Sequence, residues 1–254
     1  VLFYHSTIIN LNLKNNYEIL SFYLIDINSI IINTLYITDS KYYPFTIKQG
    51  TKTSLKLLLV ENSSFIKCMC PLRIYQFSMN FNFNITIAKS TFLQSLCPFN
   101  GGSIAISLDS TRVLKSSDSK VLITAGQILM TRTTFEKCQS YREGGSISIT
   151  FKNVHQHKNS NITLFMINCA FMENYSQRGG AIITLLVDDV YISKTKFIEN
   201  KVNRLRPSSG GAIVIDGASY VEISTTIIAN NKATYRGGAI YCAQCAHVHL
   251  HKSK

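Results

Sequence analysis

The chain lacks several signals that would point to other kinds of protein. Only four of its 254 residues are prolines, tryptophan is absent, and no long amphipathic helical segment occurs. Apolar stretches such as Ile30–Ile37 are too short and too often interrupted by polar residues to span a bilayer. The first residues also lack the basic segment, apolar run and cleavage site of a signal peptide. We therefore expect membrane association only through segments absent from this chain.

The residues that are abundant favour strands. Hydrophobic residues make up 46% of the chain, which is enough for a continuous core and excludes general disorder. Ile, Asn, Ser and Thr are frequent, and β-branched residues between turns that carry Asn or Gly are typical of strands. These features predict an all-β protein.

Basic residues exceed acidic ones, which gives a net charge of +12 and an isoelectric point near 9.4. Nucleic-acid-binding proteins usually gather such charge on one stripe or helix, whereas here it is scattered, so we expect no nucleic-acid partner. We interpret the lysines as solvated residues on outward strand positions. The alternative is attraction to an acidic surface, a glycan or a lipid headgroup. The densest cluster comprises Lys194, Lys196, Lys201, Arg204 and Arg206.

A Gly-Gly pair followed by a small residue and Ile occurs five times, and such self-similarity indicates a repeat architecture. The residue two positions after that Ile is apolar in most copies, as in a strand with one buried face. The pairs are Gly101 and Gly102, Gly144 and Gly145, Gly179 and Gly180, Gly210 and Gly211, and Gly237 and Gly238.

A second motif precedes each Gly-Gly pair by eight to thirteen residues. It consists of an aromatic or Ile anchor and, in its complete form, an Asn three positions later. The anchors are Phe92, Phe135, Phe171, Phe197 and Ile228, with Phe65 as an earlier copy that no glycine pair follows. The complete motifs end in Asn174, Asn200 and Asn231, whereas Cys68, Ser95 and Cys138 replace the Asn in the earlier copies.

Aligning the six anchors produces columns of like residues. If each anchor starts a new coil, these residues stack at the strand spacing of roughly 4.8 Å. Parallel strands without intervening helices need such a coil. The sequence therefore predicts a right-handed parallel β-helix, a solenoid of pectate-lyase-like architecture, with an Asn amide ladder and with glycines that permit positive φ and close backbone approach. The column five positions before the anchor holds Val60, Ile87, Met130, Met166, Ile192 and Ile223.

The anchors are spaced by 27, 43, 36, 26 and 31 residues. The short spacings fit one coil, and the long ones require extra residues that loop outward. We expect these inserts near residues 107–120, 151–161 and 201–209, where variable loops on a rigid stack commonly carry binding function. In this interpretation residues 58–254 form the repeats, and residues 1–57 form degenerate early coils or an N-terminal cap.

Both motifs are complete in Phe171–Asn174 with Gly179–Ile182 and in Phe197–Asn200 with Gly210–Ile213. They resemble the repeat of the polymorphic outer membrane proteins of chlamydiae and of related β-helix surface proteins, over about residues 58–242. The resemblance implies an extracellular or cell-surface passenger, at the outer membrane if bacterial. Such a passenger is often adhesive and has no enzymatic site.

Parallel β-helices also host enzymes that cleave polysaccharides. These enzymes need two or more carboxylates, or an acidic Ca²⁺ site with a basic residue, on one face. The best candidates among only fourteen acidic residues are Asp188 and Asp189, which precede a strand, where a turn aspartate is normal. We predict no catalytic residue and no enzymatic activity, because other coils offer no aligned carboxylate. The position equivalent to Asp189 is occupied there by Asn84, Gln127, Thr163 and Tyr220.

The seven cysteines are an odd number and form no small-domain disulfide framework. Several fall at interior positions of the repeat, where a buried, unreactive thiol is expected. Cys242 and Cys245, followed by His247 and His249 on one strand face, are candidate zinc ligands. Their spacing is more compact than in the usual zinc modules, so a final half-coil with exposed histidines is the alternative. We predict no bound metal or cofactor.

Four Asn-x-Ser/Thr sequons, at Asn62, Asn84, Asn161 and Asn174, are possible glycosylation sites in a secreted eukaryotic protein. Asn174 falls at a predicted turn, so we expect it to be the most accessible of the four.

The leading hypothesis is a non-catalytic, secreted or cell-surface β-helix. Its insert loops would bind extracellular proteins or glycans in adhesion or self-association. One alternative is a carbohydrate-active enzyme whose activity would be lost in Asp188→Ala or Asp189→Ala. The other is a structural spacer within a long extracellular protein.

Overall fold

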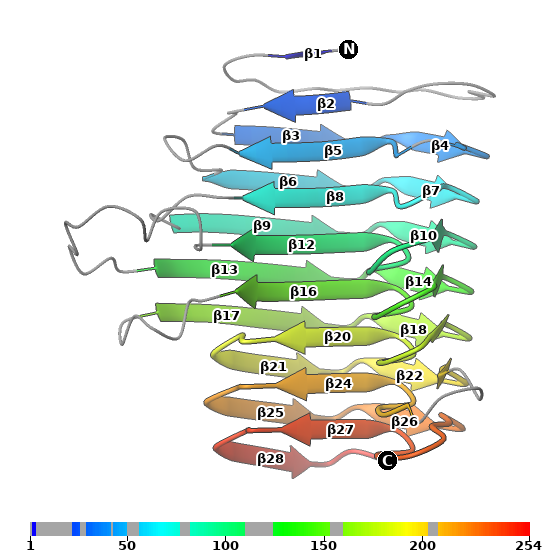
Figure 1. Ribbon diagram of the computed structural model, residues 1–254, viewed down its shortest axis with the longest axis vertical. Coiled ribbons are helices and arrows are strands. Elements are labelled where there is room, and N and C mark those ends of the chain that lie inside the picture. The colour runs from blue at the N-terminus through cyan, green and yellow to red at the C-terminus, as the bar shows by residue number, and fades with distance from the viewer. Residues whose placement is uncertain are drawn as a thin grey trace.

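The computed structural model describes residues 2–3, 22–25, 29–41, 43–49, 56–76, 82–109, 124–152, 160–202 and 208–254. The regular elements in these ranges are all β-strands. They wind into a right-handed coil whose turns lie one above another (Figure 1). Strands at the same place in successive coils pair in parallel. The predicted all-β parallel β-helix is confirmed.

Two long sheets run along the stack. The 9-stranded sheet has the order β1-β2-β5-β8-β12-β16-β20-β24-β27, and the 8-stranded sheet has the order β28-β25-β21-β17-β13-β9-β6-β3. The strands of the first are β1 (Leu2–Phe3), β2 (Phe22–Ile25), β5 (Phe45–Gln49), β8 (Leu72–Gln76), β12 (Ile104–Asp109), β16 (Ile147–Lys152), β20 (Ile182–Leu185), β24 (Ile213–Asp216) and β27 (Ile240–Ala243). Those of the second are β3 (Ser29–Asn33), β6 (Leu57–Glu61), β9 (Asn82–Ala88), β13 (Thr124–Thr131), β17 (Ser160–Ile167), β21 (Asp189–Ser193), β25 (Tyr220–Ser224) and β28 (His247–His251).

Two narrower sheets complete each coil. The 7-stranded sheet has the order β26-β22-β18-β14-β10-β7-β4, and the 4-stranded sheet has the order β11-β15-β19-β23. The strands of the first are β4 (Tyr36–Thr38), β7 (Ser64–Ile66), β10 (Thr91–Leu93), β14 (Thr134–Glu136), β18 (Ala170–Met172), β22 (Lys196–Ile198) and β26 (Ile227–Ala229). Those of the second are β11 (Leu96–Cys97), β15 (Gln139–Ser140), β19 (Tyr175–Ser176) and β23 (Lys201–Val202).

The columns found in the sequence coincide with the strand register. Ile192 pairs with Met166 on one side and with Ile223 on the other. Buried and half-buried residues alternate along β21, so one face of the strand lines the interior. Like residues therefore stack along the axis of the coil, and each fully buried aliphatic side chain contributes about 1.5–3 kcal/mol.

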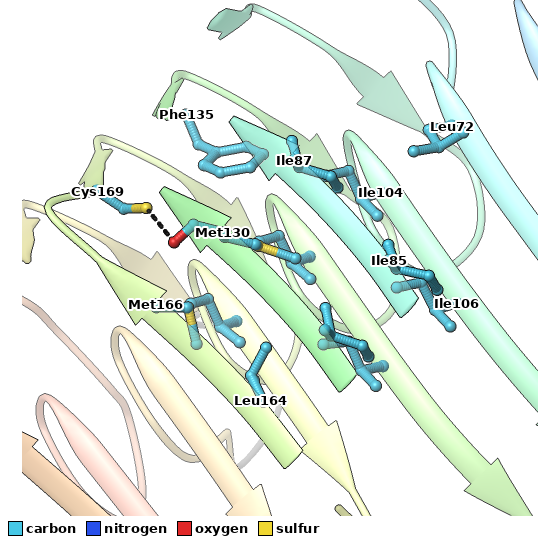
Figure 2. Packing of buried hydrophobic residues seen from close by; sticks show 14 of the residues in the cluster. Leu72, Ile85, Ile87, Ile104, Ile106, Met130, Phe135, Leu164, Met166 and Cys169 are labelled. Atoms are coloured by element: carbon cyan, nitrogen blue, oxygen red, sulfur yellow. Dashed lines mark hydrogen bonds between the residues drawn. The ribbon is translucent and has the colours of Figure 1, made fainter. Parts of the chain in front are cut away.

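The phenylalanine anchors form a continuous stack of buried rings. From Phe65 to Phe197, adjacent ring centroids lie 4.8 or 4.9 Å apart, with planes within 10° of parallel. Figure 2 shows Phe135 in the same interior as Ile87, Ile104 and Met130. The ring spacing equals the strand spacing, so an aromatic residue in each coil packs directly on the next.

The asparagines that end the complete motifs form the predicted amide ladder. Asn174 Nδ2 donates to Asn200 Oδ1, and Asn200 Nδ2 donates to Asn231 Oδ1, each at 2.9 Å. Asn200 Nδ2 also donates to the carbonyl of Phe171 at 3.0 Å. Because Asn174 and Asn200 are fully buried, the ladder satisfies polar groups that would otherwise be unpaired in the interior.

Replacing Asn200 with alanine should lower the free energy of unfolding by about 2 kcal/mol, because a buried polar group left unpaired costs about 1–3 kcal/mol. The main-chain N–H of Asn174 and the carbonyl of Phe171 would both lose their side-chain partner. Urea unfolding followed by circular dichroism measures the change. Asn84→Ala, at an exposed position, is the control, and equal losses in the two variants would contradict the ladder's role.

The two glycines of each pair have different roles. The first lies in the left-handed region, with a φ of +64° at Gly179. In the first four pairs the second glycine lies so close to the next coil that a Cβ would clash with its backbone. At Gly180 the Cβ would lie 2.1 Å from the carbonyl oxygen of Gly211. Only a residue without a side chain fits there. The predicted positive φ and close backbone approach are both confirmed.

Residues 29–49, apart from Tyr42, continue the stack toward the N-terminus. Ile30 pairs with Leu58, and Ile37 pairs with the anchor Phe65. This part of the chain therefore shares the register of the later coils, although it has no Gly-Gly motif. The described ranges hold no helical segment that could span a bilayer.

Candidate functional site

Asp188 and Asp189 lie where the chain passes from β20 to β21. Asp188 Oδ2 accepts a hydrogen bond from the main-chain N–H of Ile162 at 2.8 Å, so this side chain links adjacent coils. Asp189 is aligned with Thr163 and Tyr220, so the described neighbouring coils offer no carboxylate at its position, as predicted. Partial burial raises the pKa of Asp189. The arrangement gives Asp188 a structural role.

The C-terminal histidines lie on the outside of the last coil. Cys242 and Cys245 form a disulfide, so neither sulfur is a free thiolate that could bind zinc. His247 and His249 belong to β28 and are exposed. Across the described ranges, no group of three or more His, Cys, Asp or Glu side chains could hold a metal ion. Cys242 occupies the column of Ile215, as predicted.

A second disulfide, Cys70–Cys97, joins two neighbouring coils and was missed from the sequence. The signal was present in the repeat. Cys70 and Cys97 are each five residues after an anchor, Phe65 and Phe92, so they occupy the same column in successive coils. Their separation of 27 residues equals the spacing of those two anchors. Stacking at one register position brings the sulfurs together.

Three cysteines are free, and all three are buried: Cys68, Cys138 and Cys169. Burial raises the pKa of Cys68 to about 12 and that of Cys169 to about 11, and it also raises the pKa of Cys138. Cys138 Sγ lies 3.0 Å from the hydroxyl of Ser103. The thiols are therefore protonated at neutral pH, in agreement with the expectation of buried thiols in the interior columns.

Alkylation should distinguish the free thiols from the cysteines that form disulfides. We expect iodoacetamide to label no cysteine in the folded, unreduced protein at about pH 8, because the free thiols are protonated and buried. Denaturation without reduction should expose three thiols, and reduction should expose all seven. Intact mass counts them, and seven labels without reduction would contradict both disulfides.

The raised pKa values of these three thiols should make the stability of the fold depend on pH. Their folded pKa values lie above that of an exposed thiol, about 8.5. Protonation therefore favours the folded state fully below about pH 8.5, and this contribution is lost as the pH rises through the folded values of about 11 and about 12. The urea midpoint should fall progressively above about pH 9, and a Cys68→Ala, Cys138→Ala, Cys169→Ala variant should show a smaller fall.

The four sequons differ in exposure. The prediction that Asn174 is the most accessible is wrong, because its side chain is 0% exposed and forms part of the amide ladder. The turn at which it lies directs the amide inward. There it accepts a hydrogen bond from the main-chain N–H of Cys138 and donates one to the carbonyl of Phe135, both in the preceding coil. Asn62, Asn84 and Asn161 are exposed, and these three remain candidates for glycosylation.

A hollow of about 700 Å³, here called the amide hollow, lies where β9, β13 and β17 begin. Its lining includes the side-chain amides of Asn84, Gln127 and Asn161. Among the lining residues, the ring of Phe83 occupies the space that a side chain at Gly126 would need, since a Cβ there would lie 2.3 Å from ring atoms. Amides both donate and accept hydrogen bonds, so this surface suits a hydroxyl-rich or peptide ligand.

The extra residues of the repeat fall mainly between a strand of the 9-stranded sheet and the next strand of the 8-stranded sheet. The predicted inserts near 107–120, 151–161 and 201–209 fall largely on residues 110–123, 153–159 and 203–207, which lie outside the described residues. The first two connect a strand of the 9-stranded sheet to the next strand of the 8-stranded sheet. The strands that precede them, β12 and β16, end on the same side of the stack (Figure 1). The amide hollow lies at this edge.

Comparison with known proteins matches one segment of the chain. Residues 225–243 match the model of the Chlamydia polymorphic membrane protein repeat. This segment contains one complete unit, from the anchor Ile228 and the ladder residue Asn231 to the glycines Gly237 and Gly238. No curated protein and no solved structure matches the chain. Polymorphic membrane proteins are surface proteins of the outer membrane and are generally not enzymes. The resemblance inferred from the two motifs is thereby confirmed at this repeat.

Proposed function

We propose that the protein is a non-catalytic β-helix exposed at the cell surface, which acts in adhesion through the segments inserted at one edge of its stack. The observation that carries the proposal is the position of the strand ends that these segments connect. Residues 110–123 and 153–159 each connect a strand that ends at the same edge of the stack to the next strand of the 8-stranded sheet, and the strands that they connect keep their register. A rigid stack with variable segments at one edge can present different contact surfaces without altering its interior.

Two further features support a location outside the cytoplasm. The disulfides Cys70–Cys97 and Cys242–Cys245 need an oxidising compartment, because cytoplasmic thiols are kept reduced. The matched repeat belongs to a family of surface proteins. The register gives the two adjacent aspartates no aligned carboxylate, so adhesion is favoured over polysaccharide cleavage.

Transplanting a short connection tests the role of the inserts. Ser107 and Gln127 hold the register positions of Leu185 and Asp189. The three residues Leu186–Asp188 connect Leu185 to Asp189. The same three residues can therefore replace residues 108–126 and connect Ser107 to Gln127. Cell and matrix binding of the labelled variant, compared with that of the wild-type chain, should fall strongly, while far-UV circular dichroism shows that the β-helix still forms.

A second transplant is the matched comparison. Thr150 and Thr163 hold the same two register positions, so the same connection can replace residues 151–162. Full binding by both transplants would contradict a role for these inserts. A wild-type chain that binds no cell type or matrix protein would count against adhesion itself.

A further inference from the structure

A second hollow, of about 180 Å³, lies on the outer face of the 9-stranded sheet and is here called the arginine hollow. Alternate residues of β8 and β12 face outward here. Arg73 and Tyr75 of β8 are large, whereas the residues aligned with them on β12, Ala105 and Ser107, are small. The step from large to small side chains between adjacent coils produces the depression. Arg142, from the turn that precedes Gly144, completes its wall.

Aromatic rings hold the guanidinium of Arg73 at the wall of this hollow. Its central carbon lies 4.8 Å from the ring centroid of Tyr43 and 5.0 Å from those of Tyr75 and Phe99. Such contacts fix a cation without neutralising it. Burial lowers the pKa of Arg73, but an arginine remains charged at neutral pH. Its Nε is buried and has no hydrogen-bond partner among the described residues.

The charge of the arginine hollow is uncompensated in the described part of the chain. Neither Arg73 nor Arg142 takes part in an ion pair there. The nearest carboxylate on this turn, Glu143, is held by Arg178 at 3.6 Å and by the amide of Asn100 at 3.3 Å. Two arginines therefore line one small opening, which favours an anionic ligand.

Hydroxyl-bearing residues also line the opening. Ser107, Ser148 and Thr150 lie beside the two arginines, and Tyr75 supplies an aromatic wall. Hydroxyls can both donate to and accept from the hydroxyl groups of a sugar, and a ring packs against its apolar C–H face. At about 180 Å³ the hollow is smaller than the roughly 300–1,000 Å³ typical of pockets that enclose a whole ligand. It therefore suits a single charged sugar unit.

We propose that the arginine hollow binds the sulfate or carboxylate group of an acidic saccharide, with Arg73 and Arg142 contacting the anion and the serine and threonine hydroxyls contacting the sugar ring. This inference rests on the proposed surface role and names one class of partner for it. Saccharide binding by the purified chain can nevertheless be measured without any cell, so the two proposals can fail separately.

Isothermal titration of the full chain tests the proposal with three probes: a sulfated heparin tetrasaccharide, trigalacturonate and neutral maltotriose. We expect one or both acidic probes to bind and maltotriose not to bind. Binding of the sulfated probe alone identifies sulfate, and binding of trigalacturonate alone identifies a uronate carboxylate. Binding of neither acidic probe, or equal binding of maltotriose, would overturn the site.

Two variants that each remove one positive charge distinguish binding at this site from nonspecific attraction of an anion to a basic protein. Arg142→Gln should weaken binding of the acidic probe about tenfold, because a charge-assisted contact is lost. Lys196→Gln removes the same charge at an exposed position of β22 in a different sheet and should change affinity less than about twofold. Arg73→Gln gives a second loss at the site if circular dichroism shows it folded. Equal weakening by Arg142→Gln and Lys196→Gln would refute a defined site.

Discussion

Replacing Ile192 with aspartate is expected to leave no folded protein. The side chain is 1% exposed and lies between Met166 and Ile223 in the interior stack. Burying an unpaired carboxylate there would cost at least several kcal/mol, against a total stability of about 5–15 kcal/mol for a typical domain. Far-UV circular dichroism and urea unfolding measure the result. Ile213→Asp, in the 9-stranded sheet, should fail in the same way.

The residue that follows is the matched control. Ser193 is half-buried on the opposite face of β21, so Ser193→Asp should change the free energy of unfolding by less than about 1 kcal/mol. A variant with aspartate at Ile192 that unfolds at the wild-type urea concentration would contradict the interior stack. Loss of structure in both variants would show instead that β21 tolerates no charge on either face.

Gly180→Ala has the second largest expected effect, a loss of roughly 3 kcal/mol or more, because an added methyl group without space forces backbone shifts. Its Cβ would lie 2.1 Å from the carbonyl oxygen of Gly211 and 2.8 Å from main-chain atoms of Lys201. Backbone atoms cannot move aside as a flexible side chain can. The two coils would have to separate, which would weaken the hydrogen bond from Gly180 N–H to the carbonyl of Gly210. Chemical unfolding of the purified variant measures the loss.

The repeat supplies its own control for this substitution. Gly238 is the second glycine of the last pair, and a Cβ there would meet no atom within 4 Å. Gly238→Ala should therefore change stability by less than about 1 kcal/mol. If both alanine variants lose stability equally, the cost arises from the backbone conformation of the motif and not from contact with the neighbouring coil.

The sequence was sufficient to predict the coil because its repeating residues report directly on stacking. Phe171 and Phe197 recur at the position where rings overlap, and Asn174 and Asn200 recur where their amides bond to one another. Gly180 recurs where two backbones touch. Each motif meets a physical requirement of the parallel stack, and the strand register agrees with these requirements.

The corners of the coil could not be predicted, because their residues carry no local signal. Lys137, Glu173 and Lys194 have φ values between +51° and +54°, although left-handed backbone costs an L-residue about 1–2 kcal/mol. Hydrogen bonds between coils offset this conformational cost. One example is the bond from Lys194 N–H to the carbonyl of Ser224, at 3.1 Å. A lysine or glutamate at such a corner is indistinguishable in sequence from one on a strand.

The hollows were also missed, since they depend on pairs of residues in different coils. The arginine hollow arises from Arg73 in one coil and Ala105 in the next, and neither residue is conspicuous alone. Asn174 shows the opposite error. A turn in a soluble protein usually exposes its side chains, but a turn in a solenoid can direct a side chain into the interior.

Because the described strands of each coil pair only with those of the coils directly before and after it, the length of the protein can change by whole turns. Ile192 and Ile223 hold the same place in successive coils, so deletion of residues 192–222 would join Tyr191 to Ile223 and bring Asn174 against Asn231. Recombination between repeats in the gene could thus shorten or extend such a molecule while its cross-section stays the same. The distance that it reaches from a surface would then evolve independently of the segments that it presents there.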